Sequence, residues 1–206
     1  MSRNAVIIDI ETTGEDPKQD RICSLALIAL VEGQIPPDGQ LYLVFDPGRD
    51  NATGAADRNR FGDWLLRHQK PFAHYAESLR GILLPAPLVI GHNLAIKMNF
   101  INRELERAGQ EAVCPREFCT REAAARRWPS ESPALKDCLA RLGYKREERN
   151  HGASEDCALT AALYLFFQGN MEPDIRYPAK PQNLRPAPPA PDSLPPRLDS
   201  GLRSSS

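Results

Sequence analysis

The sequence has no long apolar run and no paired cysteines. No apolar stretch approaches the roughly 20 residues that a membrane-spanning helix needs, and the N-terminus lacks the basic-then-apolar order of a signal peptide. The five cysteines are scattered and include no CxxC pair, which argues against a disulfide framework or a zinc site. We therefore expect a cytoplasmic protein with free thiols and no membrane partner.

The sequence also lacks an excess of charge of either sign. Its formal net charge is −1 over 206 residues, so no global basic field attracts nucleic acid. This balance does not exclude a nucleic-acid enzyme, because a few local Arg and Lys side chains can hold a short single strand. The length suits one domain of ordinary size plus a tail.

The composition changes near the C-terminus. From Glu172 onward, prolines crowd together among Arg, Ser and Asp residues. Such a segment has too few apolar groups to offset the entropy of ordering it. We expect residues 1–170 to form the folded domain and residues 171–206 to form a disordered, proline-rich tail. The tail is either a tether for a partner or a solvated terminus.

Apolar periodicity predicts strands and helices in one α/β domain. Three strands joined by short turns favour an antiparallel meander, and a further short buried strand follows; the expected strands are 5–8, 21–31, 41–45 and 88–90. Apolar residues recur at helical spacing in five later segments; these are 72–84, 94–108, 120–128, 134–142 and 154–167.

Two acidic residues follow the first strand. Asp9 and Glu11 are two residues apart, so in an extended chain they share one face. Neighbouring carboxylates repel each other and are costly to desolvate unless a cation lies between them. The pattern indicates a cation site at the end of the strand, and a strand end with solvated acids is the alternative.

Two other places bring chemically active residues to the ends of elements. His151 precedes Asp156 by five residues across a loop-to-helix junction, so both can face one cleft. A lone histidine in a charged loop is also compatible with a solvated surface. His92 and Asn93 form the turn into the helix at 94–108, and we interpret His92 as structural.

In this order and spacing, the motifs resemble the DEDDh branch of the DEDD 3′-5′ exonucleases, typified by the proofreading epsilon subunit of bacterial DNA polymerase III. The resemblance covers about residues 4 to 168, and it rests on 9–14 (DIETTG), 88–93 with 100–105 (LVIGHN and FINREL), 151–156 (HGASED) and the loop 61–72. It implies a ribonuclease H-like fold, with a mixed five-stranded sheet flanked by helices and the carboxylates at one edge.

The resemblance also implies a set of site residues. Asp9, Glu11 and Asp156 would hold the first of two Mg²⁺ or Mn²⁺ ions, and Asp9 would bridge to the second. His151 would be the general base that deprotonates the attacking water, a role suited to a group titrating near neutrality. Divalent cations of this kind prefer carboxylate oxygens, and a metal pair activates water and stabilises the transition state.

One position departs from the family pattern. Four residues after Asn93 the family has its fourth carboxylate, whereas this chain has Lys97. Three carboxylates and one ammonium suit a single ion better than a pair. Three interpretations stay open: a one-metal site with reduced activity in which Lys97 takes part of the second ion's role, a catalytically inactive fold, or an outward Lys97 paired with Glu104 or a substrate phosphate.

Further residues are candidates for contact with nucleic acid. Phe61 can stack on a base and Arg60 can pair with a phosphate, and packing or solvated surface is the alternative for both. Thr12, Thr13 and Asn93 flank the carboxylates in the sequence and complete the predicted nucleic-acid-binding set.

The function expected from the sequence is that of a metal-dependent DnaQ-type exonuclease that hydrolyses phosphodiester bonds at the 3′ ends of single-stranded DNA. A DNA polymerase subunit is a candidate partner. The alternative is an inactive exonuclease-fold module that binds nucleic acid or a polymerase.

Overall fold

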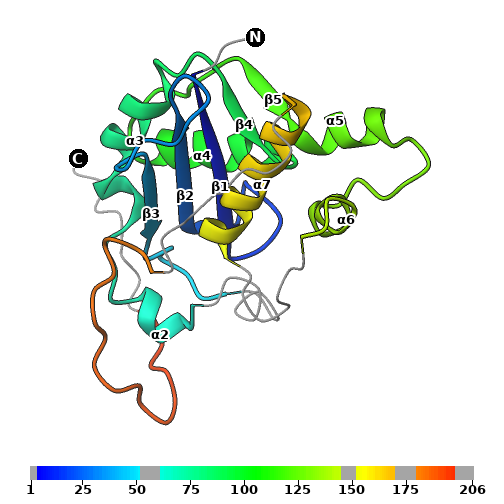
Figure 1. Ribbon diagram of the computed structural model, residues 1–206. Helices are drawn as coiled ribbons and strands as arrows, with labels where there is room; N and C mark the ends of the chain where they lie inside the picture. Colours follow the sequence, from blue (N-terminus) through cyan, green and yellow to red (C-terminus); the bar gives the residue numbers. More distant parts are fainter. Residues whose placement is uncertain (1–3, 52–60, 145–151, 170–179, 198–206) are drawn as a thin grey trace.

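A five-stranded mixed sheet forms the centre of the protein. The computed structural model describes residues 4–51, 61–144, 152–169 and 180–197. The strand order is β3-β2-β1-β4-β5, in which β1, β2 and β3 are antiparallel and β1, β4 and β5 are parallel (Figure 1). The strands are β1 Ala5–Thr12, β2 Ile22–Leu30, β3 Gln40–Val44, β4 Val89–Gly91 and β5 Glu117–Cys119.

The helices follow the predicted order. They are α2 Asp63–Leu66, the 3-10 helix η1 Phe72–His74, α3 Ala76–Leu83, α4 Leu94–Arg107, α5 Thr120–Arg127, α6 Leu135–Arg141 and α7 Ala153–Phe167. The expected α/β class and mixed five-stranded sheet are confirmed. The sequence did not locate β5 or α2, because segments of three and four residues carry too little periodicity to detect.

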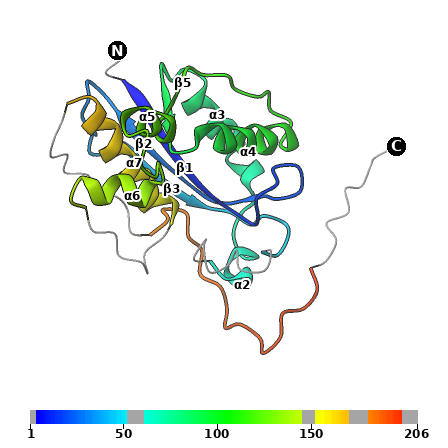
Figure 2. The same ribbon diagram turned by 90° about the vertical axis from the view of Figure 1, so that its right-hand side faces the viewer.

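Alternation along β1 divides the core into two layers. Val6, Ile8 and Ile10 pack with α3 and α4, whereas Ala5 and Ile7 pack with α7. Figure 2 shows α3 and α4 on one side of the sheet and α7 on the other. Asp9 and Glu11 continue the series that begins with Ala5 and Ile7, so the sequence places them on the α7 face.

The short β4 leaves one side of β1 open. β4 pairs with β1 only at Val6 and Ile7, and the chain then turns at Gly91 into α4. Beyond Ile7, β1 therefore pairs with β2 on one side and with no described strand on the other, where Lys97 of α4 contacts Asp9. This end of β1 is where Asp9 and Glu11 lie.

Residues 180–197 of the proline-rich tail lie against the domain. They form no helix or strand, as expected for a segment with so many prolines. Hydrogen bonds connect this segment to β3 and to the region of α2, and Figure 1 shows it as the orange and red trace passing α2. Among the described residues, no helix has the length and apolar character needed to cross a bilayer.

Candidate active site

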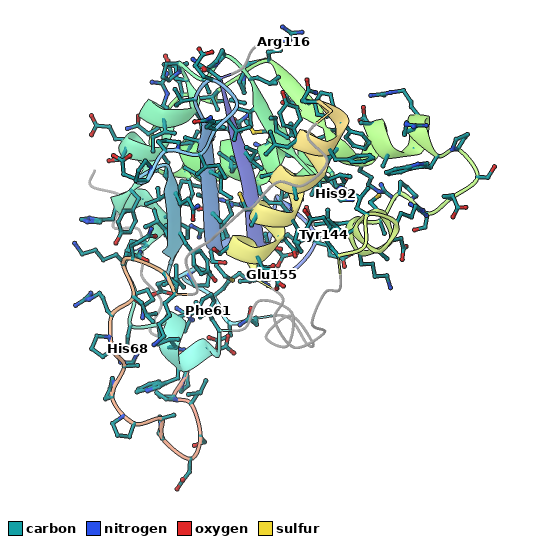
Figure 3. The ribbon with its side chains drawn as sticks, in the orientation of Figure 1. Phe61, His68, His92, Arg116, Tyr144 and Glu155 are labelled. Carbon is teal, nitrogen blue, oxygen red and sulfur yellow. The ribbon has the colours of Figure 1, made fainter. Side chains whose placement is uncertain are left out.

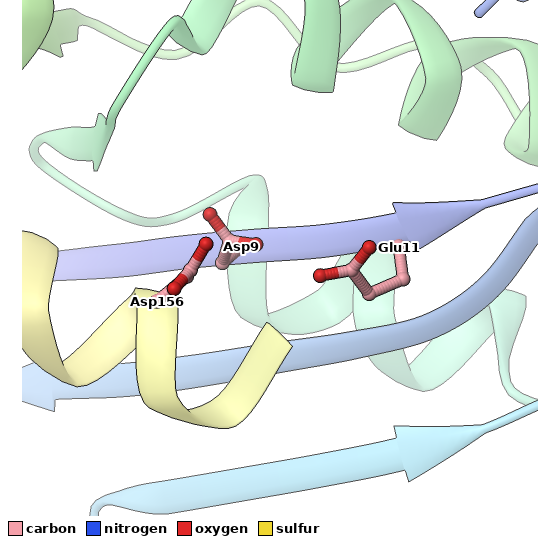
Figure 4. A group of neighbouring side chains, drawn as sticks. All are labelled: Asp9, Glu11 and Asp156. Carbon is pink, nitrogen blue, oxygen red and sulfur yellow. The ribbon is translucent and has the colours of Figure 1, made fainter. Parts of the chain in front are cut away.

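Three carboxylates from distant parts of the sequence meet at the open end of β1. One oxygen from each of Asp9, Glu11 and Asp156 lies within 4.8 Å of the others. Figure 4 shows Asp9 and Glu11 on β1 with Asp156 on the first turn of α7. Asp9 is 3 % exposed, so the cluster combines like charge with burial. Such a set is the oxygen-only environment that Mg²⁺ or Mn²⁺ prefers.

Local structure explains how Asp156 reaches the other two. α7 begins after Gly152, and the backbone N–H of Asp156 donates to the Gly152 carbonyl over 3.0 Å. The first turn of a helix favours a negative charge, because unpaired N–H groups point toward it. One residue later, the Cys157 thiol lies 3.4 Å from the Ile7 carbonyl oxygen, so α7 packs directly on β1.

Lys97 contributes a cation to the same cluster. Its ammonium nitrogen lies 2.8 Å from Oδ1 of Asp9, and the Lys97 side chain is 16 % exposed. Burial is the largest single influence and disfavours the charged form, but the combined attraction of Asp9, Glu11 and Asp156 outweighs it, so the pKa of Lys97 is raised. Lys97 is therefore charged at neutral pH and neutralises part of the carboxylate cluster.

The register of α4 fixes the position of Lys97. Leu94, Met98 and Ile101 are buried in the core, which leaves Lys97 near the start of α4 directed to the open side of β1. Asn93 precedes the helix in the left-handed region, with φ 61° and ψ 48°, a conformation that asparagine tolerates better than most residues. The turn thereby aims the first turn of α4 at the carboxylates.

The interpretation that pairs Lys97 with Glu104 is wrong. Glu104 is 2 % exposed and lies between two arginines. Arg21 contacts it through Nε at 2.5 Å and Nη2 at 2.8 Å, and Arg107 contacts it at 3.0 Å. Glu104 lies two turns along α4 from Lys97, where its carboxylate binds this arginine pair.

A pocket of about 430 Å³ lies between the end of β1 and the start of α4, and Lys97 is the residue that both lines it and contacts the carboxylate cluster. Its wall combines apolar side chains with polar groups and the Lys97 side chain, and it consists of Ile10, Thr12, Gly14, Glu15, Asn93, Ile96, Lys97 and Phe100. Thr12, Asn93 and Lys97 are predicted site residues, whereas the other five were not predicted from the sequence. Helical spacing indicates two of the five, because Ile96 and Phe100 follow Asn93 at steps of three and four.

The other predicted contact residues divide between pocket and core. Thr12 lines the pocket, and its hydroxyl donates to the Gly14 carbonyl over 2.6 Å. Thr13 is fully buried, and its hydroxyl bonds Asp20 at 3.1 Å. The structure therefore gives Thr13 a role in holding the loop that follows β1, which corrects the expectation that it contacts nucleic acid.

The structure favours packing as the role of Phe61. Its ring is 8 % exposed and lies 6.5 Å from the Tyr42 ring, centroid to centroid, in the region near α2 (Figure 3). A ring covered in this way has no free face for a base, so of the two alternatives left open by the sequence the structure supports packing. His151 and Arg60, the predicted general base and phosphate contact, lie outside the described residues.

His92 occupies a structural position beside the site. Its Nδ1 lies 3.0 Å from the Thr120 hydroxyl, which connects the β4–α4 turn to the start of α5. Burial, followed by the charges of Lys97 and Arg121, lowers the pKa of His92 to about 4. A neutral, buried imidazole supports the structural interpretation of His92.

Comparison with known proteins places this geometry in a family. The sequence matches the exonuclease family (RNase_T) over residues 6–164. It is 26 % identical to the 3′-5′ exonuclease DinG of Bacillus subtilis (strain 168), over 78 % of this chain and 17 % of DinG. It is 25 % identical to the DNA polymerase III subunit epsilon of Rickettsia prowazekii (strain Madrid E), over 89 % of this chain and 82 % of that subunit.

Solved structures agree on the fold. The complex of E. coli exonuclease I with single-stranded DNA superposes with a TM-score of 0.67 at 16 % identity, over 79 % of this chain and 40 % of that one. Exonuclease X in complex with a 5′ overhanging duplex gives a TM-score of 0.59 at 19 % identity, over 80 % and 91 % of the two chains. These neighbours confirm the ribonuclease H-like fold.

The family match spans both β1, which carries Asp9 and Glu11, and the first turn of α7, which carries Asp156. The relationship to the DnaQ-like exonucleases that the motifs predicted is thereby confirmed. The chain belongs to the exonuclease family.

Proposed function

We propose that this protein is a metal-dependent 3′-5′ exonuclease that removes nucleotides from single-stranded DNA and uses one divalent cation, Mg²⁺ or Mn²⁺. The observation that carries the proposal is the convergence of Asp9, Glu11 and Asp156, whose oxygens lie within 4.8 Å of one another at the end of β1. Three oxygen donors at this spacing fit a hard divalent cation.

The chemistry follows from the charges in the site. A cation held by the three carboxylates would polarise the scissile phosphate and activate a water molecule. Three carboxylates carry −3 and the Lys97 ammonium carries +1, so the cluster carries a formal charge of −2, which one divalent ion balances. Lys97 would also attract the phosphate of the substrate. We propose His151 as the general base, on the motif that it forms with Asp156.

The pocket supports a nucleotide end as the substrate. Its volume of about 430 Å³ falls within the range of small-molecule sites. Apolar Ile10 and Ile96 offer a surface for a base, whereas Thr12, Asn93 and Lys97 offer polar contacts to sugar and phosphate. The relatives named as 3′-5′ exonuclease and polymerase III epsilon subunit motivate the polarity and the candidate polymerase partner.

We further propose a cytoplasmic location and a catalytic domain that ends near residue 170. All five cysteines are free thiols in the structure, as in proteins of reducing compartments. The family match ends at residue 164 and α7 ends at Phe167, so the catalytic elements are complete before the proline-rich segment begins.

One observation favours a second candidate function. The Lys97 ammonium contacts Asp9 at 2.8 Å, and a cation must compete with that ion pair for the same carboxylate. If the ion pair prevails, the fold would bind nucleic acid or a polymerase without cutting. The two candidates differ in whether the carboxylates support catalysis.

A nuclease assay distinguishes them. Single-stranded DNA labelled at its 5′ end is incubated with Mg²⁺ or Mn²⁺ and with wild type, Asp9→Ala, Lys97→Asp or Asp38→Ala. The last variant is a matched control, because Asp38 is exposed on the β2–β3 turn at the far end of β1 from the site. We expect wild type and Asp38→Ala to shorten the DNA stepwise and Asp9→Ala to be inactive.

Two results would count against the proposal. Unchanged degradation by Asp9→Ala would show that the carboxylates do not act. Inactive wild type with active Lys97→Asp would identify the non-cutting module. Calorimetric titration with Mn²⁺ tests the single-ion arrangement, and two ions per wild-type chain would contradict it.

A further inference from the structure

Residues 180–197, here called the strap, lie along the outer edge of β3 and across α2. We propose that this edge is a docking site for an extended, proline-rich chain segment, and that the strap is its occupant. In this position the strap covers the free sheet edge and keeps it from pairing with a second copy of the chain.

The strap forms a series of hydrogen bonds with the outer edge of β3. The side-chain oxygens of Gln182 and Asn183 accept from the backbone N–H groups of Tyr42 and Val44, at 2.5 and 2.9 Å. The Asn183 amide donates back to the Val44 carbonyl at 2.8 Å, and the Gln182 N–H donates to the Tyr42 carbonyl at 2.9 Å. Side-chain amides thus replace a neighbouring strand.

The strap also contacts residues that follow β3 in the sequence. Gln69, which is 6 % exposed, forms a reciprocal pair with the backbone of Arg185, receiving its N–H at 2.9 Å and donating to its carbonyl at 3.0 Å. The Trp64 indole N–H on α2 donates to the Pro188 carbonyl at 2.7 Å. Each of these contacts is to the backbone of the strap, as expected for recognition of an extended segment.

Salt bridges hold the C-terminal end of the strap. Arg197 contacts Asp46 at 2.7 Å and Asp50 at 2.8 Å. Asp50 also pairs with Arg67 at 2.6 Å. The Arg197 side chain is 18 % exposed, and burial is outweighed by its bonds to Asp50 and Asp46, so the pKa of Arg197 is raised. The strap is therefore held at both ends.

The composition of the strap suits this mode of binding. Six prolines lie between Arg185 and Arg197, at positions 186, 188, 189, 191, 195 and 196. Proline restricts the backbone to extended conformations before binding, so little conformational entropy is lost on docking. Proline also lacks an N–H, so most of the strap cannot add a further strand to the sheet.

Covering β3 has a physical consequence. An uncovered edge strand presents unpaired N–H and C=O groups that pair readily with another chain. β3 lies at the edge of the sheet, and its outward groups at Tyr42 and Val44 are those that the strap binds. Removal of the strap would expose them to the same edge on a second copy.

Hydrogen exchange tests the docked position in the full-length chain. In Gln182→Ala/Asn183→Ala, we expect the Tyr42 and Val44 amides to exchange at least about tenfold faster than in wild type. The Phe45 amide donates to the Cys23 carbonyl on β2 and should not change. Asp192→Ala, at an exposed strap position, is the matched control. Unchanged exchange of Tyr42 and Val44 in the double variant would overturn the proposal.

A second experiment tests whether the strap binds the β3 edge when it is supplied as a separate peptide. A chain that ends at residue 179 and carries Trp128→Phe leaves Trp64 as its only tryptophan. We expect this chain to self-associate and to show altered Trp64 emission, and a synthetic peptide of residues 180–197 should reverse both effects saturably. A truncated chain that stays monomeric, and whose Trp64 emission does not change when the peptide is added, would overturn the proposed docking site. If truncation prevents folding, the exchange experiment decides.

Discussion

The ammonium of Lys97 lies 2.8 Å from Oδ1 of Asp9, so the chain supplies a positive charge to its own carboxylate cluster. The DEDDh pattern has a carboxylate at that position, and its replacement changes the formal charge of the four side chains from −4 to −2. Metal number, metal affinity and catalytic rate all depend on this charge.

Replacing Lys97 with aspartate should make the protein depend more strongly on metal. Lys97→Asp places four carboxylates together, and their repulsion should lower the melting temperature without metal by several degrees. Saturating Mn²⁺ should then raise the melting temperature more in Lys97→Asp than in wild type, because ligand binding stabilises the folded state. Thermal unfolding with and without Mn²⁺ measures both effects.

Lys97→Met is the matched control for that experiment. It removes the ammonium without adding a carboxylate, so its response to Mn²⁺ should fall between wild type and Lys97→Asp. An equal Mn²⁺ response in all three proteins would mean that Lys97 has no influence on the metal site.

Glu104 should be a major contributor to stability. Its carboxylate is buried between Arg21 and Arg107, and Arg107 also donates to the Pro17 and Lys18 carbonyls in the loop after β1. Glu104→Gln leaves two partly buried guanidinium groups without their anion, and we expect a loss of about 2–4 kcal/mol in the free energy of unfolding. Urea denaturation measures this loss.

The control for Glu104 lies on the same helix. Glu106 pairs with Arg103 at the surface, and both side chains are nearly half exposed. Glu106→Gln should change the free energy of unfolding by less than about 0.5 kcal/mol. Equal effects of the two substitutions would show that the ion pairs of the buried Glu104 carboxylate with Arg21 and Arg107 do not stabilise the fold.

His92 should make folding sensitive to mild acid. Its pKa is about 4 in the folded state against an ordinary 6.5, so the unfolded chain binds a proton more readily. Stability is therefore lost as the pH falls from 6.5 toward 4. Relative to His92→Gln, wild type should lose about 2 kcal/mol between pH 7 and pH 5.

Urea denaturation of both proteins at pH 7, 6 and 5 isolates the contribution of the histidine, since the other titrating groups are common to them. Parallel pH profiles would exclude a depressed pKa at His92.

Gly14 should tolerate no side chain. A Cβ at this position would lie 2.4 to 2.6 Å from the Asp20 carboxyl atoms, and that carboxylate already accepts from Thr13 and from the Asp16 N–H. Gly14→Ala must displace Asp20, and we expect a loss of about 1–3 kcal/mol. Gly81→Ala is the control, because open space surrounds this helical glycine, and it should stabilise α3 by about 0.5–1 kcal/mol. Chemical denaturation of both variants compares the two positions, and a neutral Gly14→Ala would refute the predicted clash.

Much of the site was predictable because it depends on local periodicity. Alternation along β1 placed Asp9 and Glu11 on one face of the sheet. The apolar stripe of α4 fixed the position of Lys97 on the helix relative to the buried face. The sequence left Phe61 open between base stacking and packing and placed Thr13 in contact with nucleic acid, because a sequence does not state how far a ring or a hydroxyl is buried. The bonds between the strap and β3 were also missed, since Gln182 and Tyr42 are 140 residues apart.

The sequence by itself determined the longer strands and helices and the chemical character of the motifs, because these depend on residues only a few positions apart, whereas the short β5 and α2 were not located. Only the tertiary structure decided that the Lys97 ammonium contacts Asp9 instead of Glu104. The reason is geometric: β4 pairs with β1 only at Val6 and Ile7, so β1 continues past it, and Lys97 in the first turn of α4 reaches Asp9 on that open side.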